Sequence, residues 1–281
     1  MSLIVKANDN GFGAAIEGLE LRKGLSAEAV EEVRNAWLAH QVVFFPNQPL
    51  EHLELEAFTR AFGDFGDDPY VAPIDSHEHI LEVRREPDEA VSPFGGSWHS
   101  DWSFQETPPA ATILHAKIVP PTGGNTLYAD GIAAYESLSD AMQSELNDLQ
   151  AVHSARRPYS HEGYQASGGP DRSMTILPDD KAWATQLHPV VRTHPESGRK
   201  ALWVNPVYTL SIHEMTEPES NRLLEHLFSH ALSEQFLYSH GWQANMLTMW
   251  DNRSVQHCAT GGYDGHRRVM HRTTVAGDQP V

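Results

Sequence analysis

The stretch Trp98-His99-Ser100-Asp101-Trp102 organises our interpretation of both the fold and the chemistry of this chain. Side chains alternate along an extended segment, so His99 and Asp101, two residues apart, point to the same side. One imidazole nitrogen and one carboxylate can then reach a single divalent metal. An isolated H-x-D triplet is common by chance, so the interpretation depends on what the rest of the chain adds.

His257, far downstream, supplies a second imidazole. Two imidazoles and one carboxylate are the facial triad that leaves positions open on non-haem Fe(II) for O₂ and a chelating co-substrate. Residues 268–275 (RVMHRTTV) are rich in β-branched residues, which predicts a strand with Arg268 and Arg272 on one face. Two inward-facing cations are unfavourable unless anions meet them. The alternative is that both are surface arginines paired with acidic neighbours.

Composition limits the possible partners. The 281 residues carry a formal net charge of −18, which disfavours nucleic acid and anionic membranes. No apolar run approaches the roughly 18 residues of a membrane span. The chain has one cysteine and no visible signal peptide, so we expect a reducing, cytoplasmic location.

The predicted helices lie between groups of predicted strands and do not alternate with single strands. Helices are predicted after Ser26, over 51–62, after Ser139, and after the capping box that begins at Thr216. This grouping favours a β-rich core with flanking helices over a doubly wound sheet. Irregular residues 64–96 and 155–180 are candidate lids, with an ordinary surface loop as the alternative. Strands are predicted within 42–46, 79–86, 98–128, 188–195, 201–208 and 246–275.

Several separated motifs, taken in order, resemble the TauD/TfdA family of Fe(II)- and 2-oxoglutarate-dependent dioxygenases over nearly the whole chain. The resemblance implies a single dioxygenase domain over 1–281, with a double-stranded β-helix (jelly-roll, cupin-like) core. It also implies the cofactors Fe(II), 2-oxoglutarate and O₂, release of succinate and CO₂, and a homo-oligomer (dimer or tetramer). The motifs are HQVVFFPNQ (40–48), WHSDWSFQETPPA (98–110), PPTGGNTLYAD (120–130), HPVVRTHPESGRKAL (188–202), WDNRSVQH (250–257) and HRRVMHRTTV (266–275).

Matching motif positions imply roles for individual residues. Arg268 and Thr126 would hold the distal carboxylate of 2-oxoglutarate, and Arg272 an anionic end of the prime substrate. We therefore expect hydroxylation of a small anionic organic molecule: a sulfonate, a sulfate ester, or a carboxylate such as an aryloxyalkanoate. The implied iron ligands, which are also the catalytic centre, are His99, Asp101 and His257.

The expected substrate pocket differs from that of taurine dioxygenase, the best-known member of the family. Asp68 and Val71 stand where that enzyme has His and Tyr, and Gly95 and Trp102 replace its Asn and Val. We therefore expect that taurine is not the natural substrate, with taurine dioxygenase proper as the alternative. On a regular strand Trp102 would face away from His99 and Asp101, so it belongs either to the pocket wall or to the core.

Two other classes of protein use the same metal ligands: a non-catalytic metal-binding β-barrel and a zinc hydrolase. Arg268 and Arg272 discriminate against the hydrolase, because that chemistry needs no clamp for 2-oxoglutarate.

Overall fold

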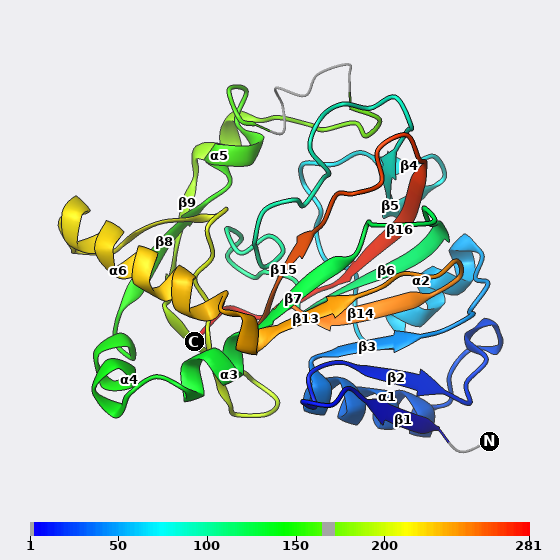
Figure 1. The fold of residues 1–281 in the computed structure, drawn as a ribbon, viewed down its shortest axis with the longest axis horizontal. Coiled ribbons are helices and arrows are strands. Elements are labelled where there is room, and N and C mark those ends of the chain that lie inside the picture. The colour runs from blue at the N-terminus through cyan, green and yellow to red at the C-terminus, as the bar shows by residue number, and fades with distance from the viewer. Residues whose placement is uncertain (1–2, 165–171) are drawn as a thin grey trace.

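The computed structural model describes residues 3–164 and 172–281, and its largest element is a sheet of eight strands (Figure 1). The strand order is β1-β2-β3-β14-β6-β16-β5-β4, so segments from both halves of the chain lie side by side. The strands are β1 (Ile4–Ala7), β2 (Ala14–Glu17), β3 (Val42–Phe45), β4 (Pro73–Ile74), β5 (His77–Arg85), β6 (Ala111–Ile118), β14 (Leu247–Asp251) and β16 (Arg268–Val275).

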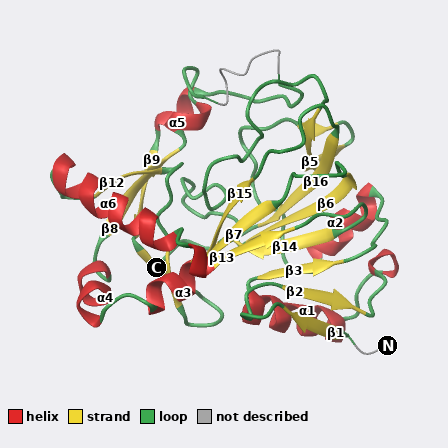
Figure 2. Ribbon diagram, viewed as in Figure 1, coloured by secondary structure: helices red, strands yellow, loops and turns green. Residues whose placement is uncertain are grey.

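A three-stranded sheet of order β13-β7-β15 packs against the large sheet. Leu114 and Met270 from the large sheet and Tyr128 and Val255 from the small one share one buried cluster. Two mainly antiparallel sheets packed around a common core form a jelly roll, which confirms the expected mainly-β fold with flanking helices (Figure 2). The small sheet consists of β7 (Thr126–Asp130), β13 (Leu237–His240) and β15 (Val255–Ala259).

Helices cover the outer face of the large sheet. Val43 and Phe45 of β3 face them, whereas Val42 faces the small sheet, as strand alternation requires. Trp37 and Phe58 complete this outer layer, and burying each such side chain contributes roughly 1.5–3 kcal/mol. The two helices are α1 (Ala27–His40), capped by Ser26 as predicted, and α2 (His52–Arg60).

A second group of helices packs with small sheets on the opposite side of the molecule from α1 and α2 (Figure 1). The predicted caps at Ser139 and Thr216 are both present. The helices are α3 (Gly131–Glu136), α4 (Asp140–Leu146), α5 (Arg156–Tyr159) and α6 (Glu217–Ala231). The strands are β8 (Gln150–Ser154), β9 (Thr185–Pro189), β10 (Val191–Thr193), β11 (Lys200–Leu202) and β12 (Thr209–Ile212). Short 3₁₀ helices are η1 (Leu21–Lys23), η3 (Asp180–Trp183) and η4 (Glu234–Phe236).

Two strand predictions were too long. Residues 101–110 form turns rather than a strand, because Trp102 adopts a left-handed φ of 48° and two prolines follow at 108 and 109. The predicted strand over 201–208 shrinks to β11, since the chain turns at Asn205 and Pro206. Within the described residues, no helix is long and apolar enough to cross a membrane.

The two candidate lids have different structures. Residues 64–96 include β4 and β5, so their middle belongs to the large sheet, while their two ends are irregular. Residues 155–180 include α5 and η3, but residues 165–171 lie outside the described part of the chain.

Candidate active site

His99 and His257 are brought together by the backbone. The two residues form an isolated antiparallel bridge, with His99 N donating to His257 O (3.1 Å) and His257 N donating to His99 O (2.8 Å). Their ring centroids are 4.2 Å apart. The extended segment that ends at Asp101 is thus attached to β15, which places all three predicted ligands on one side of the small sheet.

The three side chains are arranged to hold a cation. His99 Nε2 lies 3.5 Å from Asp101 Oδ1, and His257 Nε2 lies 3.8 Å from Asp101 Oδ2. His99 Nδ1 donates to the Ser97 carbonyl (2.7 Å). The other ring nitrogen, Nε2, therefore keeps its lone pair free to bind a metal. All three residues are buried, and potential ligand atoms from each lie within 4.8 Å of one another.

Protonation at the triad also suits a metal. Burial and the neighbouring His99 lower the pKa of His257 to about 3, so its ring is neutral. Burial alone would raise the pKa of Asp101, but interactions led by the Arg272 guanidinium outweigh it and hold this pKa well below the usual range. Thr112 donates to Asp101 Oδ2 (2.6 Å) and orients the carboxylate. The donor set therefore fits a divalent metal such as Fe(II).

Two cavities meet at the triad; Arg268 lines one of them, and Arg272 lines both. The Arg268 cavity is lined by Arg268 and Thr126, with apolar walls that include Leu114 and Trp250. The aromatic cavity is lined by Trp102, Tyr159, Tyr164, Val207 and Tyr208. Both cavities are also lined by Phe94, Gly95, His99, Asp101 and Arg272.

Arg268 is a buried cation with no carboxylate partner among the described residues. Its Nε makes no hydrogen bond, and its guanidinium lies 5.9 Å from the Trp242 ring. Burial lowers the pKa of Arg268. Thr126 Oγ1 accepts from Trp242 Nε1 (3.0 Å), so its own hydroxyl proton can be donated into the cavity. An unpaired buried cation beside a free donor fits the distal carboxylate of 2-oxoglutarate.

Arg272 is different, because two carboxylates compensate its charge. Its Nη2 lies 3.3 Å from Asp68 Oδ1 and 3.3 Å from Asp101 Oδ1. Its guanidinium stacks 4.9 Å from the Trp102 ring centroid. Burial would lower the pKa of Arg272, but Asp101 and Asp68 outweigh it and raise this pKa. Both arginines face inward from β16, as the shared-face prediction required, and neither is a surface residue.

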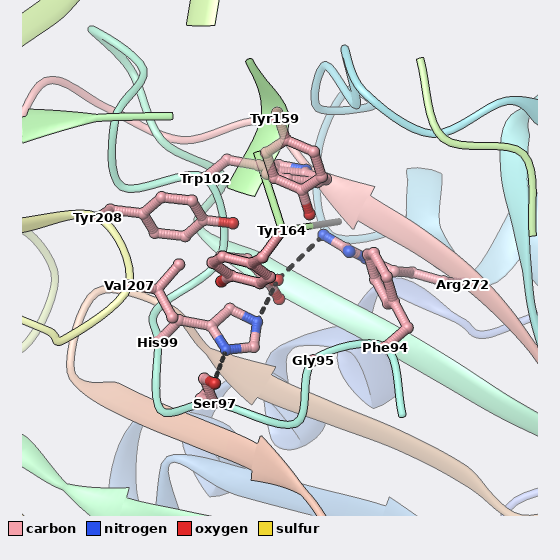
Figure 3. A pocket seen from close by; sticks show the side chains of 11 residues that line it. Phe94, Gly95, Ser97, His99, Trp102, Tyr159, Tyr164, Val207, Tyr208 and Arg272 are labelled. Atoms are coloured by element: carbon pink, nitrogen blue, oxygen red, sulfur yellow. Dashed lines mark hydrogen bonds and ion pairs between the residues drawn. The ribbon is translucent and has the colours of Figure 1, made fainter. Parts of the chain in front are cut away.

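Aromatic rings form most of the wall beyond the triad (Figure 3). Figure 3 shows Tyr159, Trp102 and Tyr208 grouped above His99 and Arg272 in this view. Burial raises the pKa of Tyr159 and of Tyr208 far above the usual phenol value, so both hydroxyls stay neutral. The sequence does not reveal the tyrosines or Val207 as pocket residues, because they come from separate segments without a recognisable motif.

The other predicted substrate residues lie at different depths: two line a cavity and two lie behind its wall. Gly95 lines both cavities, and a Cβ there would lie 3.4 Å from His99 Cε1. Trp102 is 1 % exposed and serves both predicted roles, since it lines the aromatic cavity and packs with Tyr159. Its turn, rather than strand alternation, directs it there. Asp68 stands behind Trp102, and Val71 packs in the same cluster without lining either cavity.

Known proteins share this architecture. Residues 5–274 match the family described as taurine catabolism dioxygenase TauD, TfdA family. The chain belongs to the TauD/TfdA family. It is 32 % identical to the alpha-ketoglutarate-dependent sulfate ester dioxygenase of Pseudomonas putida, over 96 % of this chain and 88 % of that one. It is 31 % identical to the alpha-ketoglutarate-dependent 2,4-dichlorophenoxyacetate dioxygenase of Cupriavidus pinatubonensis, over all of both chains. A crystal structure of a taurine dioxygenase from Burkholderia xenovorans superposes with a TM-score of 0.83 at 31 % identity, covering 100 % of this chain and 93 % of that one.

Membership in this family makes the chain an Fe(II)- and 2-oxoglutarate-dependent dioxygenase that acts on a small organic substrate. The His-Asp-His triad is present, so the expected cofactors agree with the residues that the fold brings together. The non-catalytic β-barrel and the zinc hydrolase are set aside for this chain.

Proposed function

We propose that this TauD/TfdA dioxygenase hydroxylates a small organic molecule in the aromatic cavity while 2-oxoglutarate occupies the Arg268 cavity. One observation carries the proposal: a single triad lies where two cavities meet, and the buried Arg268 lines only one of them, whereas the buried Arg272 lines both. In this assignment His99, Asp101 and His257 bind the iron. The bound metal would supply the O₂ chemistry that couples decarboxylation of 2-oxoglutarate to hydroxylation.

The residues around the metal have distinct tasks in this proposal. Arg268 and Thr126 bind the distal carboxylate, which orients the co-substrate toward the triad. Arg272 contacts the polar end of the prime substrate and so fixes which carbon faces the metal. The buried rings of Trp102 and Tyr208 exclude water from the reacting carbon. We also propose a single domain over 1–281 whose segments 64–96 and 155–180 act as lids.

The chemical class of the substrate has two candidates. An anion (sulfonate, sulfate ester or carboxylate) is expected from the sequence, and two relatives are named for a sulfate ester and for 2,4-dichlorophenoxyacetate. An uncharged substrate is favoured by one observation, the Asp68 carboxylate already beside Arg272. Taurine is disfavoured in either case, since Asp68, Val71 and Gly95 remove the three polar side chains expected for it. A cytoplasmic location and a dimer or tetramer remain predictions.

Two measurements test the proposal. Anaerobic addition of Fe(II) and 2-oxoglutarate should produce a weak metal-to-ligand charge-transfer band, and a chain without this band would not be a dioxygenase of this kind. A panel of sulfonates, sulfate esters, carboxylates and their amides should then stimulate succinate release, with taurine among the inactive members.

Arg272 gives a sharper test of the assigned roles. The Arg272→Ala variant should keep the slow, substrate-independent decarboxylation of 2-oxoglutarate but lose its coupling to hydroxylation, because the substrate is no longer oriented. Succinate and hydroxylated product are measured together. Equal loss of both would contradict the assignment of Arg272 to the prime substrate.

A further inference from the structure

Asp68 is held firmly beside Arg272. Its Oδ1 accepts from Trp102 Nε1 (2.5 Å) and lies 3.3 Å from Arg272 Nη2, while its Oδ2 accepts from Thr274 Oγ1 (2.9 Å). The side chain is 9 % exposed. Two donors, Trp102 and Thr274, from two segments thus fix one buried carboxylate against the arginine that was expected to receive the substrate's anion.

The charges of the loaded site balance before any prime substrate enters. The divalent metal and Arg268 together offset Asp101 and the two carboxylates of 2-oxoglutarate. Arg272 and Asp68 then offset each other. An anionic substrate would leave one buried negative charge without compensation, which is costly in an enclosed site.

Arg272 nevertheless keeps the ability to donate hydrogen bonds. Its Nε and Nη2 are buried without a hydrogen bond of good geometry, so its two ion pairs compensate its charge but do not use these donors. The guanidinium also lines the aromatic cavity, where Tyr159 and Tyr208 present neutral hydroxyls. A compensated cation with unused donors suits a neutral acceptor rather than an anion.

We propose that Asp68 is a specificity-determining residue, the built-in counter-ion of Arg272, and that the prime substrate presents an uncharged acceptor such as a carbonyl oxygen to this arginine. This inference rests on the proposed function, because it takes the aromatic cavity as the substrate site. It departs from the anionic class expected from the sequence, since the carboxylate of Asp68 occupies the place beside Arg272 that a substrate anion would take.

Isosteric pairs that differ in charge test this proposal. An aryloxyacetate and its aryloxyacetamide, and an aryl sulfonate and its sulfonamide, are titrated by calorimetry into the anaerobic chain loaded with Mn(II) and 2-oxoglutarate. The wild-type chain should bind each amide at least about 10-fold more tightly than its acid. The Asp68→Asn variant should bind the acids at least about 10-fold more tightly than wild type does, with the amides changed little.

Asp67→Asn is the matched control. It removes the same charge from the adjacent, exposed position and should leave every affinity unchanged. Tighter binding of the acids by the wild-type chain would overturn the inference, as would an unchanged acid-to-amide ratio in Asp68→Asn. The wild-type ratio decides the question even if that variant does not fold. Failure of the proposed function is separate, because it appears first, as absence of 2-oxoglutarate binding.

Discussion

Arg268 and Arg272 lie four residues apart on β16 and are almost equally buried, 5 % and 4 % exposed, yet their surroundings are opposite. Arg268 has apolar and aromatic neighbours and no carboxylate partner in the described parts of the chain. Arg272 lies between Asp68 and Asp101. The same strand therefore presents one cation that needs an external anion and one whose charge the protein itself compensates.

This difference shows that the direction of a buried arginine side chain and the compensation of its charge are set by different parts of the chain. Strand alternation directs both guanidinium groups inward, and it would do so whatever faced them. The loop that contains Asp68 decides that only Arg268 retains an uncompensated charge. A chain can therefore match the family motif at both arginines and still differ from other members in the ligand that one of these arginines binds.

The largest effect should come from removing the metal centre that both cavities share. His257→Ala should lower 2-oxoglutarate decarboxylation at least about 100-fold, because even residues that only orient metal ligands typically cost 10–100-fold. Succinate release and Fe(II) binding are measured, with the exposed His226→Ala as control. Retention of both properties in His257→Ala would mean that the two cavities do not meet at a metal.

Stability should respond to the two arginines with opposite sign. Arg272→Met leaves Asp68 and Asp101 without their cation and should cost about 3–5 kcal/mol of unfolding free energy. Arg268→Met replaces an unpaired buried cation with an apolar side chain and should be neutral or stabilising by about 1–3 kcal/mol. Urea unfolding of the metal-free proteins measures both. Equal destabilisation by the two substitutions would remove the distinction between them.

The same pair gives a pH test. Burial already raises the pKa of Asp68 in the folded chain, and loss of Arg272 should raise it further. A folded-state pKa above the unfolded value means that stability falls as pH rises from about 4 through the folded-state pKa. The loss of unfolding free energy in Arg272→Met, relative to wild type, should therefore be larger at pH 8 than at pH 5. A deficit independent of pH would mean that carboxylates are not its cause.

Local patterns predicted the helices and the ligands but not the pocket. Cap residues such as Ser26 and Thr216 act within one turn, so the sequence shows them directly. His99 and Asp101 share a side through simple spacing, and Arg268 and Arg272 through strand alternation. These features depend on neighbours in the chain, and they agree with the structure.

The remaining features depend on contacts between distant segments. Trp102 reaches the aromatic cavity through a left-handed φ of 48°, which no residue type around it predicts. Tyr159 and Tyr208 come from segments about fifty residues apart and share no motif. The sequence indicates only a lost polar contact at Asp68, because the pairing of Asp68 with Arg272 spans 204 positions and depends on a loop conformation. An acidic residue at an expected anion-binding position was the available signal.

The smallest predicted effect compares two indole N–H groups: that of Trp102, which lines the aromatic cavity, and that of Trp242, which donates to Thr126 in the wall of the Arg268 cavity. Trp102→Phe removes the donor to the Asp68 carboxylate and should cost about 1.5–3 kcal/mol, the range for hydrogen bonds to charged groups. Trp242→Phe removes the donor to the neutral Thr126 hydroxyl and should cost about 1 kcal/mol. Urea unfolding ranks the two variants. If Trp242→Phe costs as much as Trp102→Phe, then Asp68 does not accept as an ion, and Arg272 would be as free as Arg268 to take an anionic substrate.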